Sequence, residues 1–192
     1  MFNVILMGEK MSLRVIGGIA KGRRLKTRKV KHLRPATDFV KEALFNIITP
    51  LVPGSLFLDL FAGSGSIGIE ALSRGAGEAF FVERDPLNAA LIKENLAITH
   101  FSKQAQIYTC DIYKGLQLLN QREYQFNLIF VDPPFRHGFI EPTLERIWEF
   151  ELLVPGGLII TRSAKKEIIN VETKPLRQER YGDSVLMFYN EK

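Results

Sequence analysis

Four consecutive residues, Asp132, Pro133, Pro134 and Phe135, follow an apolar stretch and have the chemistry to hold and activate an exocyclic amine. The nitrogen of such an amine on a base is a poor nucleophile, because its lone pair is delocalised into the ring. The Asp132 carboxylate and the Pro133 carbonyl, fixed by the rigid Pro-Pro unit, can accept its two hydrogens and expose the lone pair. Phe135 offers a flat face for an extruded base. We predict that all four residues are catalytic; a rigid turn without a ligand is the alternative.

A glycine-rich stretch earlier in the chain predicts a ligand that contains a nucleoside. Gly63, Gly65 and Gly68 have the spacing G-x-G-x-x-G between an apolar run and a helical pattern. Glycines at this spacing let the backbone turn tightly and approach a ligand. Glu83 ends the next apolar run, where a carboxylate can accept both hydroxyls of a ribose. The alternative is a tight turn that only packs a helix onto a strand.

Two further acids favour S-adenosylmethionine over a dinucleotide such as NAD. Asp59 enters the glycine-rich turn, where it can face the ammonium of a methionine moiety and would repel a pyrophosphate. Asp111 follows the third apolar run, where it can accept from the adenine amino group while Ile112 packs on the ring. Each acid taken alone is more often a cap at a strand end. The predicted donor-binding residues are Asp59, Phe61, Ala62, Gly63, Ser64, Gly65, Glu83, Arg84, Asp111 and Ile112.

Lysine and arginine are concentrated near the N-terminus. Ten of the 26 lie between Lys10 and Arg34, where there is no acid, and the remaining 16 stand against 21 acidic residues. A cationic segment on an acidic body is typical of proteins that contact a phosphate backbone. A solvated surface hairpin is the alternative. The candidate RNA contacts in this segment are Arg14, Arg23, Arg24 and Lys26.

Composition sets the broad class of protein. A chain of 192 residues with 46% hydrophobic residues suits one globular domain with a small extension. A single cysteine, Cys110, excludes a disulfide framework, and with no signal peptide or transmembrane-length run we expect a cytoplasmic protein without membrane contact. No spacing of Cys, His or acids suggests a metal site. The ten residues before Met11 are expected to be an upstream extension without a role.

Elements that position these residues follow from the apolar pattern. From residue 55 onward, apolar runs alternate with helical patterns, which predicts a mostly parallel sheet with helices on both faces. In such α/β folds ligands bind at the carboxyl ends of the strands, where the unusual residues lie. A glycine-punctuated basic hairpin (residues 12–18 and 22–30) and a helix starting near residue 37 precede this core. The expected strands cover residues 55–61, 78–84, 105–110, 126–132, 155–163, 168–173 and 184–190.

Taken in order along the chain, five motifs resemble those of a known family: "LRPATDFVKEALFNI", "FLDLFAGSGSIGIEALSRGA", "VERD", "CDI" and "VDPPF". They are similar to the bacterial 16S rRNA guanine-N2 methyltransferases that modify guanine 966 of the small subunit. The resemblance runs from about Arg14 to the C-terminus. It implies a Rossmann-like, seven-stranded methyltransferase sheet whose last strand is antiparallel, S-adenosylmethionine as methyl donor, and an N-terminal extension that contacts RNA.

The same resemblance assigns further residues and partners. Arg34, Thr37, Asp38 and Lys41 match the segment that closes over the donor and faces RNA, with Thr37 and Asp38 on the donor and Arg34 and Lys41 on the RNA. It implies action on 16S rRNA within the assembled small subunit, and we expect the protein to be a monomer. We expect residues 1–36 to form the extension and residues 37–192 the methyltransferase domain.

One departure from the family and several alternative functions stay open. Thr161 and Arg162 follow the fifth apolar run, where the family has an acidic residue. We expect this change to affect substrate contacts near Arg162 and to leave the donor site and the Asp132 loop untouched. The same loop chemistry also suits adenine N6 in DNA or RNA, cytosine N4 or a protein glutamine. A nicotinamide-dependent oxidoreductase and a non-enzymatic RNA-binding module are more distant alternatives.

Overall fold

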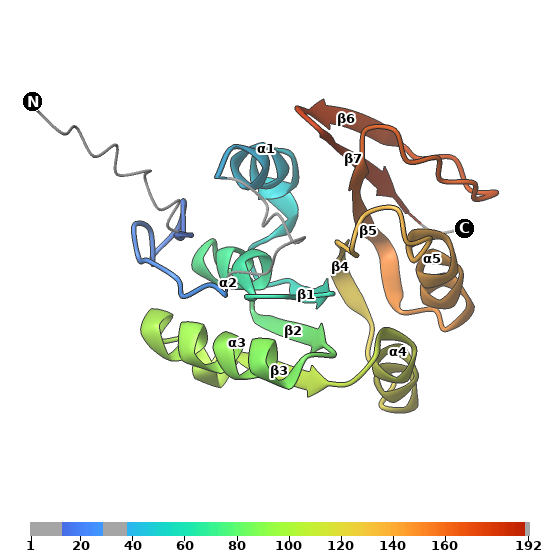
Figure 1. The fold of residues 1–192 in the computed structure, drawn as a ribbon. Coiled ribbons are helices and arrows are strands. Elements are labelled where there is room, and N and C mark those ends of the chain that lie inside the picture. The colour runs from blue at the N-terminus through green and yellow to red at the C-terminus, as the bar shows by residue number, and fades with distance from the viewer. Residues whose placement is uncertain (1–12, 29–37, 191–192) are drawn as a thin grey trace, which may run out of the picture.

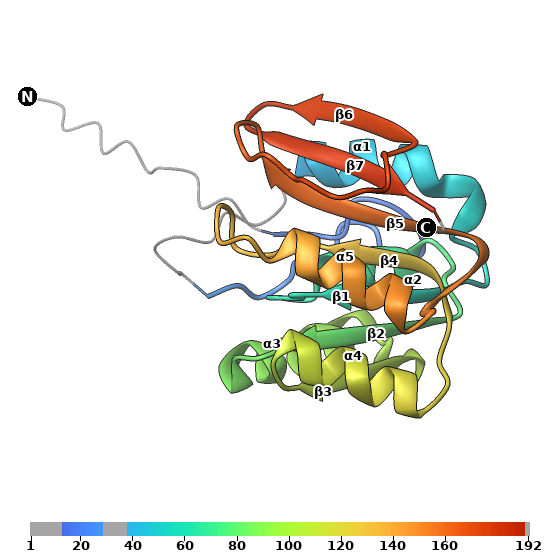
Figure 2. The same ribbon diagram turned by 90° about the vertical axis from the view of Figure 1, so that its right-hand side faces the viewer.

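A seven-stranded sheet organises the part of the chain that the computed structural model describes, residues 13–28 and 38–190 (Figure 1). Its order is β3-β2-β1-β4-β5-β7-β6, and Figure 2 shows the strands stacked in this order. The strands are β1 (Leu56–Leu60), β2 (Glu78–Glu83), β3 (Ala105–Thr109), β4 (Phe126–Val131), β5 (Leu153–Ala164), β6 (Arg177–Tyr181) and β7 (Ser184–Tyr189).

Strand direction brings the predicted site residues to one edge of the sheet. β1 pairs in parallel with β2 and β4, β2 with β3, and β4 with β5. Only β7 is reversed, because it pairs antiparallel with both β5 and β6. The predicted seven-stranded sheet with an antiparallel last strand is therefore confirmed. The carboxyl ends of β1 to β5 and the turn between β6 and β7 share one edge, since Ala164 at the end of β5 lies opposite Ser184.

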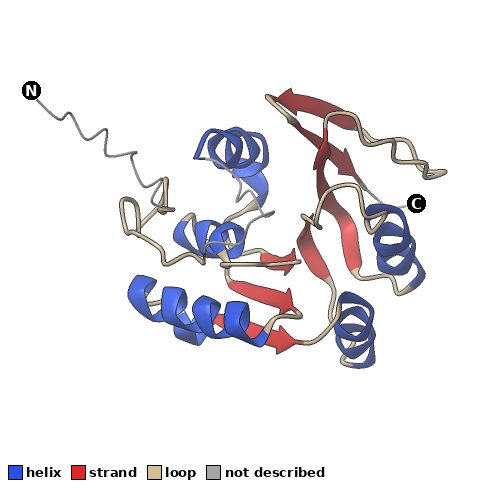
Figure 3. Cartoon of the chain, in the orientation of Figure 1, coloured by secondary structure: helices blue, strands red, loops and turns tan. Residues whose placement is uncertain are grey.

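Helices cover both faces of the sheet and bury its apolar strands (Figures 1 and 3). Two separate apolar cores result, one on each face. Phe45, Ile92 and Phe81 belong to the first core, and Leu116, Leu144 and Phe80 to the second. One face carries α1 (Asp38–Ile48), α2 (Ser66–Ser73) and α3 (Pro86–Thr99), and the other carries α4 (Ile112–Gln121) and α5 (Ile140–Glu149). Two short 3₁₀ helices, η1 (Thr49–Leu51) and η2 (Ser102–Gln104), complete the order. None of the helices described here is long and apolar enough to cross a membrane.

One predicted strand is wrong. Residues 168–173 form no strand, and Arg177–Tyr181 pairs with β7 in their place. Gly182, at a φ of 59°, allows the tight turn that folds Arg177–Tyr181 back along β7. The apolar pattern misled because β6 is an edge strand with mostly polar residues, whereas Ile168 is 88% exposed outside the sheet. Apolarity alone therefore does not decide which segment joins the sheet.

The basic segment at residues 13–28 is paired but contains no regular strand. A single antiparallel bridge joins Arg14 to Arg24 where a two-stranded hairpin was predicted. Residues 12, 29 and 30 of the predicted hairpin lie outside the described residues. Gly18 has a φ of 73°, and a Cβ there would overlap the Ser73 carbonyl oxygen, so the segment needs glycine to pass α2. Its apolar side chains Leu13, Val15, Ala20 and Leu25 enter the first core.

Candidate active site

The loop after β1 leaves one open side at the carboxyl edge of the sheet. Gly65 adopts a left-handed conformation with a φ of 75° and begins α2, and a Cβ there would lie 3.1 Å from Ile92. A Cβ at Gly68 would overlap the Phe81 ring. A Cβ at Gly63 would meet only the Phe61 carbonyl oxygen, at 4.0 Å. Gly65 and Gly68 therefore let the loop and helix pack onto β2 and α3, while the loop at Gly63 stays open to a ligand.

Glu83 holds this loop through the backbone. Its Oε2 accepts a hydrogen bond from the Gly63 amide at 2.7 Å, and its Oε1 accepts from the Asp85 amide at 2.8 Å. The residue is 7% exposed. A carboxylate fixed at the end of β2 beside an open glycine loop can exchange these bonds for those of a diol. The structure thus brings Glu83 and Gly63 together as predicted.

Asp59 lies beneath the same loop. Its Oδ2 accepts from the Gly68 amide at 3.0 Å, and the side chain is buried. Burial raises the pKa of this carboxyl well above its ordinary value; the Gly68 bond opposes the rise, and the nearby Asp132 and Glu83 charges add to it. Asp59 therefore stabilises the start of α2 from the interior. Its predicted interaction with a ligand ammonium would have to act across the glycine loop.

Asp111 and Ile112 mark the end of β3. The exposed Asp111 caps α4, since its Oδ1 accepts from the Tyr113 and Lys114 amides, each at 3.1 Å. Ile112 is only 7% exposed and packs in the second core. The structure corrects the predicted position of Ile112, because its side chain is turned mainly into the protein and offers little surface to a ring.

The predicted catalytic loop begins where β4 ends, beside the last residue of β1. The Asp132 amide lies 3.4 Å from the Leu60 carbonyl oxygen, which places the two loops next to each other. Asp132 Oδ2 forms an ion pair with an Arg162 guanidinium nitrogen at 2.6 Å. Burial raises the pKa of Asp132, and the Arg162 charge and hydrogen bond oppose that rise. Pro133 is buried, and Phe135 is half-buried under the Arg162 guanidinium, 5.0 Å from the ring centre.

Two further contacts fix the path of this loop. The Arg136 amide donates to Glu167 Oε1 at 2.8 Å, and Arg136 itself has a φ of 63°. Phe139 contacts Phe61 of the glycine loop, with ring centres 5.7 Å apart. Phe61 also has a positive φ of 62°, a conformation that bulky residues adopt only when their surroundings enforce it. The glycine loop and the Asp132 loop are thus joined into one rigid edge.

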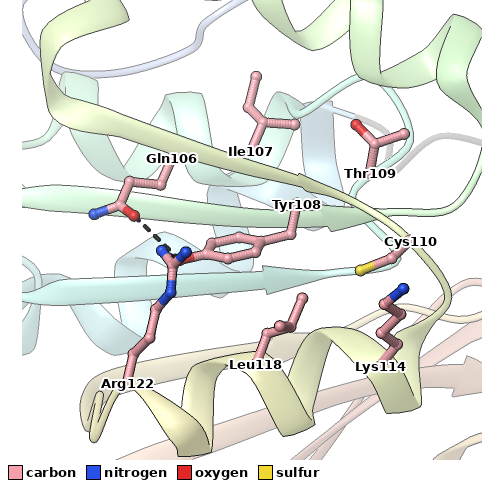
Figure 4. Close-up of a pocket in the computed structure, with 8 residues that line it drawn as sticks. All are labelled: Gln106, Ile107, Tyr108, Thr109, Cys110, Lys114, Leu118 and Arg122. Atoms are coloured by element: carbon pink, nitrogen blue, oxygen red, sulfur yellow. Dashed lines mark hydrogen bonds between the residues drawn. The ribbon is translucent and has the colours of Figure 1, made fainter.

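A surface cavity of about 390 Å³ lies away from these loops, between β3 and α4 (Figure 4). Tyr108, Cys110 and Arg122 lie along it, and none of the predicted site residues does. We therefore locate the candidate active site at the carboxyl ends of the strands and not in this cavity. No cluster of His, Cys, Asp or Glu that could hold a metal ion is found in residues 13–28 and 38–190.

The basic segment runs along α3 toward this edge. Arg23 donates to the Ile98 carbonyl oxygen near the end of α3, at 2.6 Å. Lys26 then pairs with Glu94 at 2.7 Å, and Arg28 pairs with Asp85 at the start of α3, at 2.6 Å. Because α3 starts directly after β2, the segment carries positive charge from the far end of the helix to the carboxyl edge of the sheet. Asn95 also links Lys26 to the Ser64 carbonyl oxygen.

The chain matches a known protein family over nearly its whole length. Residues 13–190 match the family model described as Conserved hypothetical protein 95. The chain belongs to this family.

Similar proteins share the fold along nearly the whole chain. The Bacillus subtilis protein YlbH, a candidate rRNA methyltransferase, is 38% identical over 94% of this chain and 100% of its own. Ribosomal RNA small subunit methyltransferase D of Haemophilus influenzae is 38% identical over 89% of each chain. The solved structure of the Escherichia coli protein yhhF, a candidate methyltransferase, has 34% identity and a TM-score of 0.78, covering 94% of this chain and 98% of that one. The predicted family resemblance and methyltransferase fold are confirmed.

Within this member of the Conserved hypothetical protein 95 family, the structure overturns one predicted RNA contact. Lys41 is fully buried, and its ammonium donates to the Arg14 carbonyl oxygen and lies 3.6 Å from Glu70 Oε2. Burial lowers the pKa of Lys41, and the Glu70 and Asp38 charges oppose this. Glu70 also accepts from the Ile16 and Gly17 amides. Lys41 therefore anchors the basic segment from inside and cannot contact a ligand.

The remaining predicted donor and RNA contacts differ in exposure and partners. Asp38 at the start of α1 pairs with the exposed Arg14 at 2.8 Å. Arg24 in the basic segment and Arg84 after β2 are exposed. Arg34 and Thr37 lie outside the described residues. The largest omission of the sequence-based prediction is Arg162, which we expected to leave the loop untouched and which contacts both Asp132 and Phe135. Its signal in the sequence was a basic residue at the end of the fifth apolar run, where we expected an acidic one.

Proposed function

We propose that this chain transfers a methyl group from S-adenosylmethionine to the exocyclic N2 of a guanine, expected to be guanine 966, in 16S rRNA of the small ribosomal subunit. One observation carries the proposal. Asp132, at the end of β4, lies beside the last residue of β1 and so beside the glycine loop held by Glu83. A nucleoside-binding loop thus adjoins a residue set able to accept the hydrogens of an amine.

The residues present fit the donor, which supplies an electrophilic methyl group on a sulfonium. Glu83 would hold the ribose hydroxyls, in exchange for its bonds to the Gly63 and Asp85 amides. Asp111 is exposed at the end of β3 and would accept from the adenine amino group. The methionine part would lie along the loop of Phe61, Ala62, Gly63, Ser64 and Gly65, and Asp59 would balance its ammonium from beneath the loop. Arg84, the exposed residue after Glu83, is the remaining proposed donor contact on this side.

On the acceptor side, the residues of this chain orient the base and its amine. Asp132 and the Pro133 carbonyl would accept the two amine hydrogens, which directs the nitrogen lone pair toward the methyl group. Phe135 would stack against the extruded base. The loop is preorganised by its contacts to Arg162 and Glu167, so little conformational entropy is lost when the base enters.

RNA as the substrate is supported by the path of the basic segment and by the relatives. Arg14, Arg23, Arg24 and Lys26 lie on the segment that leads along α3 to the catalytic edge, and Arg34 is expected to extend it. In this proposal residues 1–36 direct the RNA and residues 37–192 carry the chemistry, with Thr37 and Asp38 near the donor. The protein would act as a cytoplasmic monomer without a metal or a membrane.

The deciding experiment is transfer of labelled methyl groups from S-adenosylmethionine to small subunits that lack the modification. Naked rRNA and duplex DNA serve as parallel substrates, and the product is digested to nucleosides. We expect N2-methylguanosine from the subunits. Label in adenine, cytosine or a ribosomal protein would keep the amine-binding loop and reject guanine. No transfer to any of these substrates would reject the proposal.

A further inference from the structure

Arg162 joins three parts of the catalytic edge. It lies near the end of β5 and is 4% exposed. It pairs with Asp132 at 2.6 Å, covers the Phe135 ring with its guanidinium 5.0 Å from the ring centre, and has its Nε 3.4 Å from Ser184 Oγ at the start of β7. One side chain therefore contacts the first and the last residue of the four-residue loop and ties both to the neighbouring strands.

A buried carboxylate needs such a partner. Moving an ionised group out of water is costly unless a charge or hydrogen bonds compensate it. Asp132 and Arg162 have side chains that are 20% and 5% exposed, so solvent screens their attraction only weakly. Arginine suits this position because its planar, permanently charged guanidinium can donate to a carboxylate and stack on a ring at the same time. A lysine ammonium lacks the planar face that covers Phe135.

We propose that Arg162 is a positioning residue for methyl transfer, which keeps Asp132 an oriented carboxylate and fixes the Phe135 ring. It donates to Oδ2, and the carboxylate has a second oxygen, Oδ1, with which to accept from the amine. The contacts described for Arg162 are to the acceptor loop and to Ser184. This inference rests on the proposed function.

Charges around Asp132 set the direction of the pH dependence. Asp59 on β1 interacts electrostatically with Asp132 and with Glu83 on β2, and Arg162 on β5 is the cation that pairs with Asp132. Glu167, in the turn after β5, is held by the Arg136 amide. Because Arg162 opposes the rise of the Asp132 pKa caused by burial, its removal raises that pKa further. Asp132 then stays protonated up to a higher pH, and a neutral carboxyl group is a weaker acceptor than a carboxylate.

The test compares Arg162→Met with Arg162→Lys and with a matched control, Arg180→Met, on the exposed side of β6. For each variant, kcat is measured at saturating donor from about pH 5 to 9, and donor affinity is measured by calorimetry. For Arg162→Met we expect the acid limb of the kcat profile to move to higher pH, with a loss of roughly tenfold at pH 6 that shrinks toward pH 9. Arg162→Lys should restore most of the limb, and donor affinity should stay unchanged. A loss that is equal at every pH would make Arg162 merely structural and overturn the proposal.

A second measurement needs no transfer and separates failure of this inference from failure of the proposed function. Unfolding midpoints are measured at pH 5 and pH 8 for Arg162→Met, Asp132→Asn and the double variant. We expect Arg162→Met to lower the midpoint at pH 8, less so at pH 5, and far less in the Asp132→Asn background. Equal losses in both backgrounds would show that Arg162 does not support the Asp132 carboxylate. If the wild-type protein transferred no methyl group but this coupling held, the proposed function would fail, while the support of the Asp132 carboxylate by Arg162 would stand.

Discussion

The two halves of the catalytic edge are held in different ways. On the donor side, Glu83, Asp59 and Asp111 each accept from backbone amides that lie 20, 9 and 2 residues away along the chain. On the acceptor side, Asp132 depends on the side chain of Arg162, 30 residues away on another strand. The three acids on the donor side are therefore held by backbone amides, whereas the Asp132 carboxylate is held by a side chain of another strand. Substitutions should affect the two halves separately.

Asp132→Asn should produce the largest effect and the sharpest separation. The amide keeps the shape of the side chain but replaces one acceptor oxygen with a donor, so we expect kcat to fall by roughly a hundredfold or more. The donor dissociation constant should change little. Labelled-methyl transfer and calorimetry measure the two effects, with the exposed Glu145→Gln as control. Transfer within a few fold of wild type would remove Asp132 from the reaction.

Glu83→Gln should have the opposite pattern, with weaker donor binding and little change in kcat. If Glu83 bonds the donor hydroxyls as proposed, losing its charge should weaken donor binding by about 10- to 100-fold, the range typical of a hydrogen bond to a charged group. At saturating donor, kcat should recover most of its value. Calorimetry with S-adenosylmethionine and a saturation series of the transfer rate decide this. Unchanged donor affinity would mean that Glu83 only braces the loop.

Charge reversal at Arg23, Arg24 and Lys26 tests the segment that lies outside both halves. We expect RNA affinity to fall by about tenfold near 0.15 M salt, and the dependence on salt to become shallower by roughly one unit of slope per lost phosphate contact. Donor affinity should not change. Filter binding across a salt series measures both quantities. The control reverses Lys103, Arg122 and Arg146, three exposed cations elsewhere on the surface. Equal RNA affinity in the two triple variants would reduce the segment to an aid to solubility.

Asp59→Asn should have the smallest effect, and it acts on stability. The folded-state pKa of Asp59 is raised by burial, so the folded protein binds its proton more tightly than the unfolded chain does. Stability is then highest at acid pH and falls as the pH rises through the folded pKa. An amide removes this penalty, so we expect a melting temperature about 2–4 °C higher at pH 8 and a smaller difference at pH 5. Donor affinity should decrease. A lower melting temperature at pH 8 would contradict the role of burial.

Much of the fold and of the donor half could be predicted from the sequence, because their signals are local. The glycine spacing, the acid ending each apolar run and the two prolines all act within a few residues of the strand that carries them. Residues 168–173 were assigned wrongly for the same reason. Their apolarity is local, whereas the pairing of β6 depends on the turn at Gly182 and on an open edge of β7.

The long-range contacts could not be predicted. Lys41 was assigned to RNA by resemblance, yet its side chain is buried and pairs with Glu70 of another helix. Arg162 looked like a change in a surface contact, yet the parallel pairing of β4 with β5 places it against Asp132. In both cases the partner of a charge decides its role, and that partner is known only once the strands and helices are packed.

The bonds of Asn95 have a thermodynamic consequence. Its side chain is fully buried on α3, accepts from the Lys26 amide, and donates to the carbonyl oxygens of Lys26 and Ser64. One amide group thus joins the segment proposed to guide RNA to the loop proposed to hold the donor. If RNA shifts that segment, the change in donor affinity must be matched by an equal change in RNA affinity when the donor binds. The size of this coupling would then depend on a residue that is not among the proposed contacts of either substrate.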